Sequence, residues 1–175
     1  PFVIRGGCLS WPCKERWSFQ GFTQAYGDVP IKIADCLLRP KVNIDVPLRE
    51  YLEYVQRPEG TRLQQIVVDE KLEAPLYAYG CKPFKLIPEL REDFRLPDYC
   101  HDWCEDLDAA TREAIYPNGE PWLLMSGKGA RSRLHRDNGA TIAWFAQLQG
   151  HKLFIVHPPS EGPFMYDGEV DPSTP

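Results

Sequence analysis

The sequence predicts an α+β fold in which an N-terminal layer of helices and short strands leads into a jelly-roll barrel, a double-stranded β-helix. Helically spaced apolar residues occur in the first part of the chain. Closely spaced runs rich in Trp, Phe, Ile, Leu and Val follow at 121–127, 141–149 and 152–157. The 175 residues, 43% of them hydrophobic, suffice for one domain with its own core.

Residues 1–116 are expected to mix short strands and helices. We expect strands at 1–6, 29–34 and 76–80, where β-favouring residues cluster or alternate and glycines provide stops. A first helix is expected at 14–26. A second runs from Asp45 to Val55, with Asp45 as its cap, Pro47 in its first turn and apolar residues at helical spacing. Residues 97–116 indicate one irregular helix.

Residues 117–175 are expected to hold the first core strands of the barrel. A tight turn at Gln149-Gly150 separates the last two strand-like runs, and Pro158-Pro159 ends the series. The chain opens on Pro1 and closes on a proline-rich run with no strand after it. We therefore expect a single domain over 1–175 that lacks the C-terminal part of its barrel.

Charge and cysteine content narrow the class of protein. The net charge of −5 argues against a broad nucleic-acid surface, and no run approaches the roughly 20 apolar residues of a membrane span. The N-terminus lacks the layout of a signal peptide. Six scattered cysteines in a chain with ample apolar residues indicate free thiols in a reducing compartment. We expect a soluble intracellular protein, cytoplasmic or nuclear.

The most informative pair of residues is His135 and Asp137. On an extended backbone, residues two apart project from the same face, so this imidazole and this carboxylate could share a divalent metal. A His-x-Asp pair alone also recurs by chance in solvated turns. Here it lies between a strand-like run containing Trp122 and another containing Trp144 and Phe145.

The stretch 121–159 resembles the JmjC family of cupin-like Fe(II)- and 2-oxoglutarate-dependent oxygenases, in its hydroxylase-like branch. Further segments share the resemblance, which covers most of the chain: 1–6, 26–28, 51–52, 76–77 and 87–90. It implies that His135 and Asp137 are two ligands of a facial Fe(II) triad. The family's third ligand, a distal histidine, is not found after His157 and is expected beyond residue 175.

The resemblance also implies a site for the cosubstrate. Lys152 matches the lysine that binds the distal carboxylate of 2-oxoglutarate, and Ser132 and Tyr77 match hydroxyl groups that help to hold it. One departure concerns the strand after the metal motif, where several relatives carry an asparagine near the cosubstrate. The comparable stretch here is 143–145, Ala-Trp-Phe.

The implied activity is hydroxylation of a protein or peptide side chain, with 2-oxoglutarate decarboxylated to succinate. An alternative is a cupin-like binding or scaffold domain without catalysis. A histone lysine demethylase is a further alternative, ranked lower because no accessory reader domain is visible. We expect no nucleic-acid or membrane partner, and homodimer formation is left open.

Other motifs in the sequence support different functions less well. The tripeptide at 135–137 also spells the start of a kinase catalytic loop, but Ile142 stands where that loop needs Asn, and the other kinase motifs are absent from the sequence. Cys100 and Cys104 lack the second ligand pair of a zinc finger. His151 stays open as a metal ligand.

Overall fold

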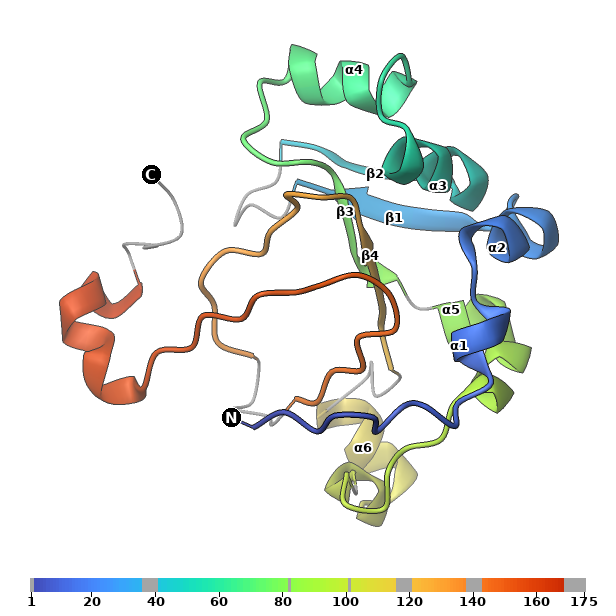
Figure 1. Cartoon of the computed structure of the whole chain (residues 1–175). Helices are drawn as coiled ribbons and strands as arrows, with labels where there is room; N and C mark the ends of the chain where they lie inside the picture. Colours follow the sequence, from blue (N-terminus) through green and yellow to red (C-terminus); the bar gives the residue numbers. More distant parts are fainter. Residues whose placement is uncertain are drawn as a thin grey trace.

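An antiparallel four-stranded sheet with the order β2-β1-β3-β4 forms the centre of the computed structural model (Figure 1). The structure describes residues 2–35, 41–81, 83–100, 102–115, 121–137 and 143–168. The strands are β1 (Pro30–Ala34), β2 (Asn43–Pro47), β3 (Tyr77–Cys81) and β4 (Leu123–Ser126).

Short helices surround this sheet. In Figure 1, α2, α3 and α4 gather at one side of it, whereas the extended segment after β4 loops away on the other. The helical elements are α1 (Cys13–Arg16), α2 (Phe19–Tyr26), α3 (Leu48–Gln56), α4 (Arg62–Asp69), α5 (Pro83–Leu86) and α6 (Ala109–Ile115), with the 3-10 helices η1 (Pro88–Asp93), η2 (Trp103–Asp106) and η4 (Pro159–Gly168).

The core lies between the sheet and its helices. Helix α3 presents Leu48, Tyr51 and Leu52 on one face, and all three are at most 3% exposed. Ile31 and Ile33 alternate along β1 toward the same core. Helix α3 is short, so burial of its apolar face against the sheet stabilises it more than its helix propensity does.

Tyr51 ties the two strands that lead to the candidate site. Its buried hydroxyl donates to the main-chain oxygen of Met125 at 2.7 Å and accepts from the main-chain N–H of Ala78 at 3.1 Å. Tyr54 supports the same strand, since its hydroxyl accepts from the N–H of Leu76. These bonds fix β3 and β4 relative to α3.

The predicted α+β class agrees with this mixture of helices and an antiparallel sheet, but a closed double-stranded β-helix is not observed. The predicted strand at 121–127 contains β4. Strands were also predicted at 141–149 and 152–157. The structure has no strand at 143–149 or at 152–157, and residues 141 and 142 lie outside the described part. The described residues of both segments pair with no strand of the sheet, and an extended chain becomes a strand only through such pairing.

Several predicted boundaries were also wrong. The helix expected at 14–26 is interrupted at Trp17 and Ser18, because the Ser18 side chain caps α2 by accepting from the N–H of Gly21. Asp45 belongs to β2 and pairs with Lys32 across the sheet, so α3 begins after Pro47. Residues 2–6 form no strand, and 102–115 hold η2 and α6 in place of one helix.

Two general predictions can be compared with the described residues. No helix among them is both long and apolar enough to cross a bilayer. The cysteines that the structure describes are free thiols, and Cys36 lies outside the described part: Cys8, Cys13, Cys81, Cys100 and Cys104.

Candidate functional site

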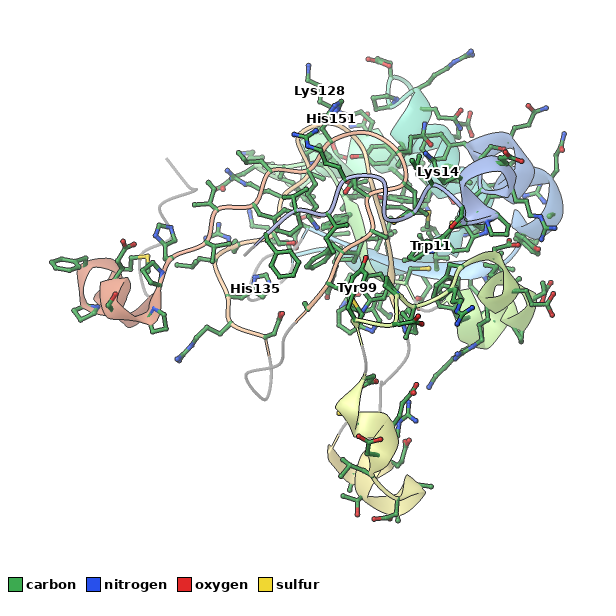
Figure 2. All side chains as sticks on the ribbon, turned by 60° about the horizontal axis from the view of Figure 1, so that its bottom comes forward. Trp11, Lys14, Tyr99, Lys128, His135 and His151 are labelled. Carbon is green, nitrogen blue, oxygen red and sulfur yellow. The ribbon has the colours of Figure 1, made fainter. Side chains whose placement is uncertain are left out.

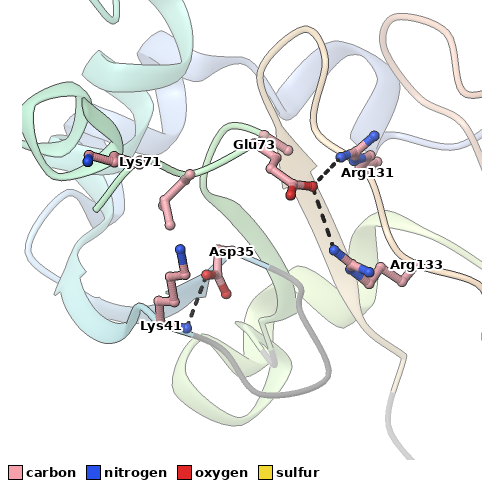
Figure 3. Close-up of a pocket in the computed structure, with 8 residues that line it drawn as sticks. Asp35, Lys41, Lys71, Glu73, Arg131 and Arg133 are labelled. Atoms are coloured by element: carbon pink, nitrogen blue, oxygen red, sulfur yellow. Dashed lines mark hydrogen bonds and ion pairs between the residues drawn. The ribbon is translucent and has the colours of Figure 1, made fainter. Parts of the chain in front are cut away.

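The segment that follows β4 carries the candidate metal ligands. It leaves the sheet at Ser126 and runs without regular secondary structure to Asp137. Two arginines in this segment contact Glu73, which precedes β3: the Nη2 atoms of Arg131 and Arg133 lie 2.9 and 3.6 Å from its Oε2 (Figure 3). The sheet and these ion pairs together hold the segment.

His135 and Asp137 face each other. The Nε2 atom of His135 lies 3.6 Å from Oδ1 of Asp137, and the side chains are 60% and 50% exposed. The Nδ1 atom of His135 lies 2.6 Å from the main-chain oxygen of Arg133. A carbonyl oxygen can only accept, so this contact needs the hydrogen on Nδ1, and in that neutral tautomer Nε2, on the side of Asp137, is the nitrogen that can bind a metal.

This geometry fits a shared divalent metal. Nitrogen and oxygen ligands lie about 2.0–2.2 Å from such a metal, so the two ligand atoms can be no more than about 4.4 Å apart. The 3.6 Å between His135 and Asp137 meets that limit, and the hydrogen bond from Nδ1 to a carbonyl is the usual support of a metal-binding histidine. Fe(II) fits this pair, although the described residues bring no third His, Cys, Asp or Glu close to it.

His135 and Asp137 lie at the surface of the described structure, where both side chains are at least half exposed. His135 also lies well apart from His151 in Figure 2, so the two histidines do not form one centre. His157 instead pairs with Glu161 at 2.9 Å.

Lys152 reaches β3 from the far end of the described chain. Its Nζ donates to the hydroxyl of Tyr77 at 3.3 Å and lies 5.0 Å and 5.1 Å from the ring centroids of Phe145 and Phe154. The two phenylalanine rings are themselves 5.0 Å apart. The aromatic faces stabilise the ammonium charge and keep it directed toward Tyr77.

Residues 152–154 alternate in direction although they form no strand. Lys152 and Phe154 share one side, whereas Leu153 is 84% exposed. Lys152 and Ser132 are both exposed residues, and their proposed contacts with the cosubstrate stay predictions. The structure thus brings Lys152 to Tyr77 and His135 to Asp137.

Sequence reasoning missed part of this arrangement. Phe145 belongs to a stretch in which an asparagine was expected, and its ring was not predicted to contact Lys152. Glu73 and its arginine partners were not singled out either. Arg131 and Arg133 lie at the same two-residue spacing as His135 and Asp137, and this spacing could have indicated that the arginines belong to the site. Nothing near Glu73 in the sequence indicates its partners, because Arg131 is 58 positions away.

Comparison with known proteins places the chain in a family. The model of the cupin-like domain matches residues 1–175. The lysine-specific demethylase JMJ21 of Arabidopsis thaliana is 27% identical over 100% of this chain and 17% of its own length. The arginine-specific demethylase JMJ22 of the same plant is 28% identical over 92% of this chain and 27% of its own length. The bifunctional arginine demethylase and lysyl-hydroxylase psr-1 of Caenorhabditis elegans is 23% identical over 91% of this chain and 36% of its own length.

The chain belongs to the cupin-like, JmjC family of Fe(II)- and 2-oxoglutarate-dependent oxygenases, so the expected resemblance to the family is confirmed, and its hydroxylase-like branch stays a prediction. It spans between 17% and 36% of the length of these three relatives.

Proposed function

We propose that this chain is part of an Fe(II)- and 2-oxoglutarate-dependent oxygenase that hydroxylates a side chain of a protein or peptide. The observation that carries the proposal is the pair formed by His135 and Asp137, whose ligand atoms face each other at 3.6 Å with Nδ1 of the histidine tied to a carbonyl. Family membership supplies the reaction class.

In this proposal His135 Nε2 and Asp137 Oδ1 hold Fe(II). A histidine from outside the described residues completes the facial triad. When bound, Fe(II) supplies the oxidation of a C–H bond to C–OH by O₂, with 2-oxoglutarate converted to succinate and CO₂. The protein residues fix the ligand geometry and the position of the cosubstrate.

Lys152 and Tyr77 are proposed to bind the distal carboxylate of 2-oxoglutarate. An ammonium and a hydroxyl 3.3 Å apart present converging donors to one carboxylate. The rings of Phe145 and Phe154, each about half exposed, lie beside the ammonium of Lys152 and limit the directions it can take. Ser132 is proposed as an additional donor.

Two reactions share this chemistry. Hydroxylation of a carbon chain leaves a stable alcohol, whereas hydroxylation of an N-methyl group gives a carbinolamine that releases formaldehyde. The matched relatives include demethylases of lysine and arginine and a lysyl-hydroxylase. We propose the hydroxylase reaction for this protein, with demethylation as the alternative that formaldehyde release would identify.

The test compares succinate formation by the full-length wild-type protein and its His135→Ala variant with added Fe(II). We expect iron-dependent conversion of 2-oxoglutarate by the wild type and none by the variant. His151→Ala is the matched control, because it removes an exposed imidazole that lies apart from His135. Equal turnover by wild type and His135→Ala would show that the metal assignment is wrong.

A binding or scaffold domain is the second candidate. It is favoured by one observation, that the described residues offer two facing metal ligands and no third. A correctly folded full-length protein that forms no succinate, with or without candidate peptides, would support this function over the oxygenase.

A further inference from the structure

Glu73 lies at the point where the chain turns from α4 into β3. Helix α4 ends at Asp69, and Lys71 adopts a left-handed conformation with φ of 51°, which stops the helix. The chain then passes Glu73 and enters β3 at Tyr77. This path places the Glu73 carboxylate against the segment that follows β4 (Figure 3).

The surroundings of Glu73 are mostly cationic. A cavity of about 70 Å³ is lined there by Asp35, Lys41, Lys71, Leu72, Glu73, Ala74, Arg131 and Arg133. Asp35 accepts the main-chain N–H of Lys41 at 3.1 Å, and the Lys41 ammonium donates to the main-chain oxygen of Glu70 at 3.4 Å. Glu73 Oε2 is the carboxylate oxygen that both Arg131 and Arg133 approach.

Arg133 connects this cluster to the candidate metal ligand. Its guanidinium contacts Glu73, and its main-chain oxygen accepts the hydrogen on Nδ1 of His135 at 2.6 Å. The position of that oxygen therefore sets both the orientation of the imidazole and the nitrogen that stays free. The free nitrogen, Nε2, is the one that faces Asp137.

We propose that Glu73 is a positioning residue for His135, acting through Arg131 and Arg133. This inference rests on the proposed function, since it assumes that His135 holds a metal. The segment from 127 to 137 has no regular secondary structure to order it. The two ion pairs restrict its conformations before a metal binds, so that less ordering is needed on binding.

The first test measures Mn(II) affinity, with 2-oxoglutarate present, for the full-length protein by electron paramagnetic resonance. We expect Glu73→Gln to weaken Mn(II) binding by up to about 10-fold, because Glu73 acts on His135 indirectly, through partly exposed ion pairs that each contribute little. Glu70→Gln is the matched control. It removes the same charge from an exposed residue that contributes its main-chain oxygen to Lys41, and it should bind Mn(II) like the wild type.

A second readout reports the histidine itself. In metal-free protein labelled with ¹⁵N-histidine, the ring nitrogens of His135, assigned by their loss in His135→Ala, should show the tautomer with hydrogen on Nδ1. Glu73→Gln should shift these signals toward a mixture of tautomers, whereas Glu70→Gln should not. In a variant whose urea unfolding curve matches that of the wild type, a role of Glu73 in folding alone would not produce this change.

The outcomes distinguish a failure of the positioning role from a failure of the proposed metal site. Mn(II) binding by the wild type, with equal affinity and an unchanged His135 tautomer in Glu73→Gln, would overturn the positioning role and leave the proposed function intact. Absence of Mn(II) binding by the wild type would overturn the metal site, and the positioning role with it. Should Glu73→Gln unfold, Arg131→Gln removes the shorter ion pair from the other side, and the same two measurements decide.

Discussion

The ammonium of Lys152 and the hydroxyl of Tyr77 are 3.3 Å apart although 75 positions separate them in the sequence. Tyr77 lies at the start of β3, where it pairs with Ala34 of β1 and Ser126 of β4. Lys152 approaches from a segment with no strand of its own. The contact therefore links the sheet to the segment that contains Phe145 and Phe154.

Replacing Lys152 by Met should raise the KM for 2-oxoglutarate about ten- to hundredfold, because a hydrogen bond to a charged group contributes about 1.5–3 kcal/mol. Tyr77→Phe should have a smaller effect, since it removes one neutral donor. Succinate formation at varied 2-oxoglutarate concentration checks both in the full-length protein. Lys128→Met, at an exposed turn after β4, is the control for loss of charge. An unchanged KM in Lys152→Met would remove its cosubstrate role.

Tyr51→Phe should lower the free energy of unfolding by about 1–3 kcal/mol. The change leaves the main-chain oxygen of Met125 and the N–H of Ala78 without their shared hydroxyl in a buried site. Tyr54→Phe is the comparison, because it removes a single acceptor from Leu76 and should cost less. Urea unfolding measures both, and equal losses would contradict the central role given to Tyr51.

The sequence predicted the elements whose pattern is local. The run at 76–80 gave β3, and the apolar spacing of Leu48, Tyr51 and Leu52 gave most of α3. Strand β2 was missed because Asp45 and Pro47 together are typical of a helix start. In the structure Asp45 forms a cross-strand ion pair with Lys32 at 3.2 Å, a contact that depends on the register of the sheet.

The same limit applies to the site. The two-residue spacing of His135 and Asp137 is visible in the sequence, and their facing geometry followed from it. The approach of Lys152 to Tyr77 was suggested by family resemblance, not by spacing. Glu73 could not be predicted, because its importance comes from the turn at Lys71 and from arginines in a distant segment.

Asp93 should be a second residue on which stability depends. Its buried carboxylate accepts from Nη1 of Arg16 at 2.6 Å and from Nε1 of Trp17 at 2.8 Å, which docks the chain between α1 and α2 onto η1. Asp93→Asn replaces one acceptor oxygen by a donor and should cost about 1.5–3 kcal/mol. Tryptophan fluorescence during urea unfolding checks this. The exposed neighbour provides the control, since Glu92→Gln should change stability little.

Stability should also decrease at alkaline pH because of Cys81. Burial raises the pKa of its thiol from 9.0 to about 11, so the folded protein holds this group neutral where an unfolded chain would ionise it. The contribution is fully present below pH 9 and is lost as the pH rises through 11. A difference of two pKa units corresponds to roughly 3 kcal/mol.

Urea unfolding at pH 8, 9, 10 and 11 tests this contribution. Between pH 9 and 11, Cys81→Ala should lose stability less steeply than the wild type, by up to about 1.4 kcal/mol per pH unit. The comparison uses slopes, because the cavity left by alanine lowers the stability of the variant by the same amount at each pH. Parallel curves for the two proteins would show that Cys81 does not carry this pH dependence.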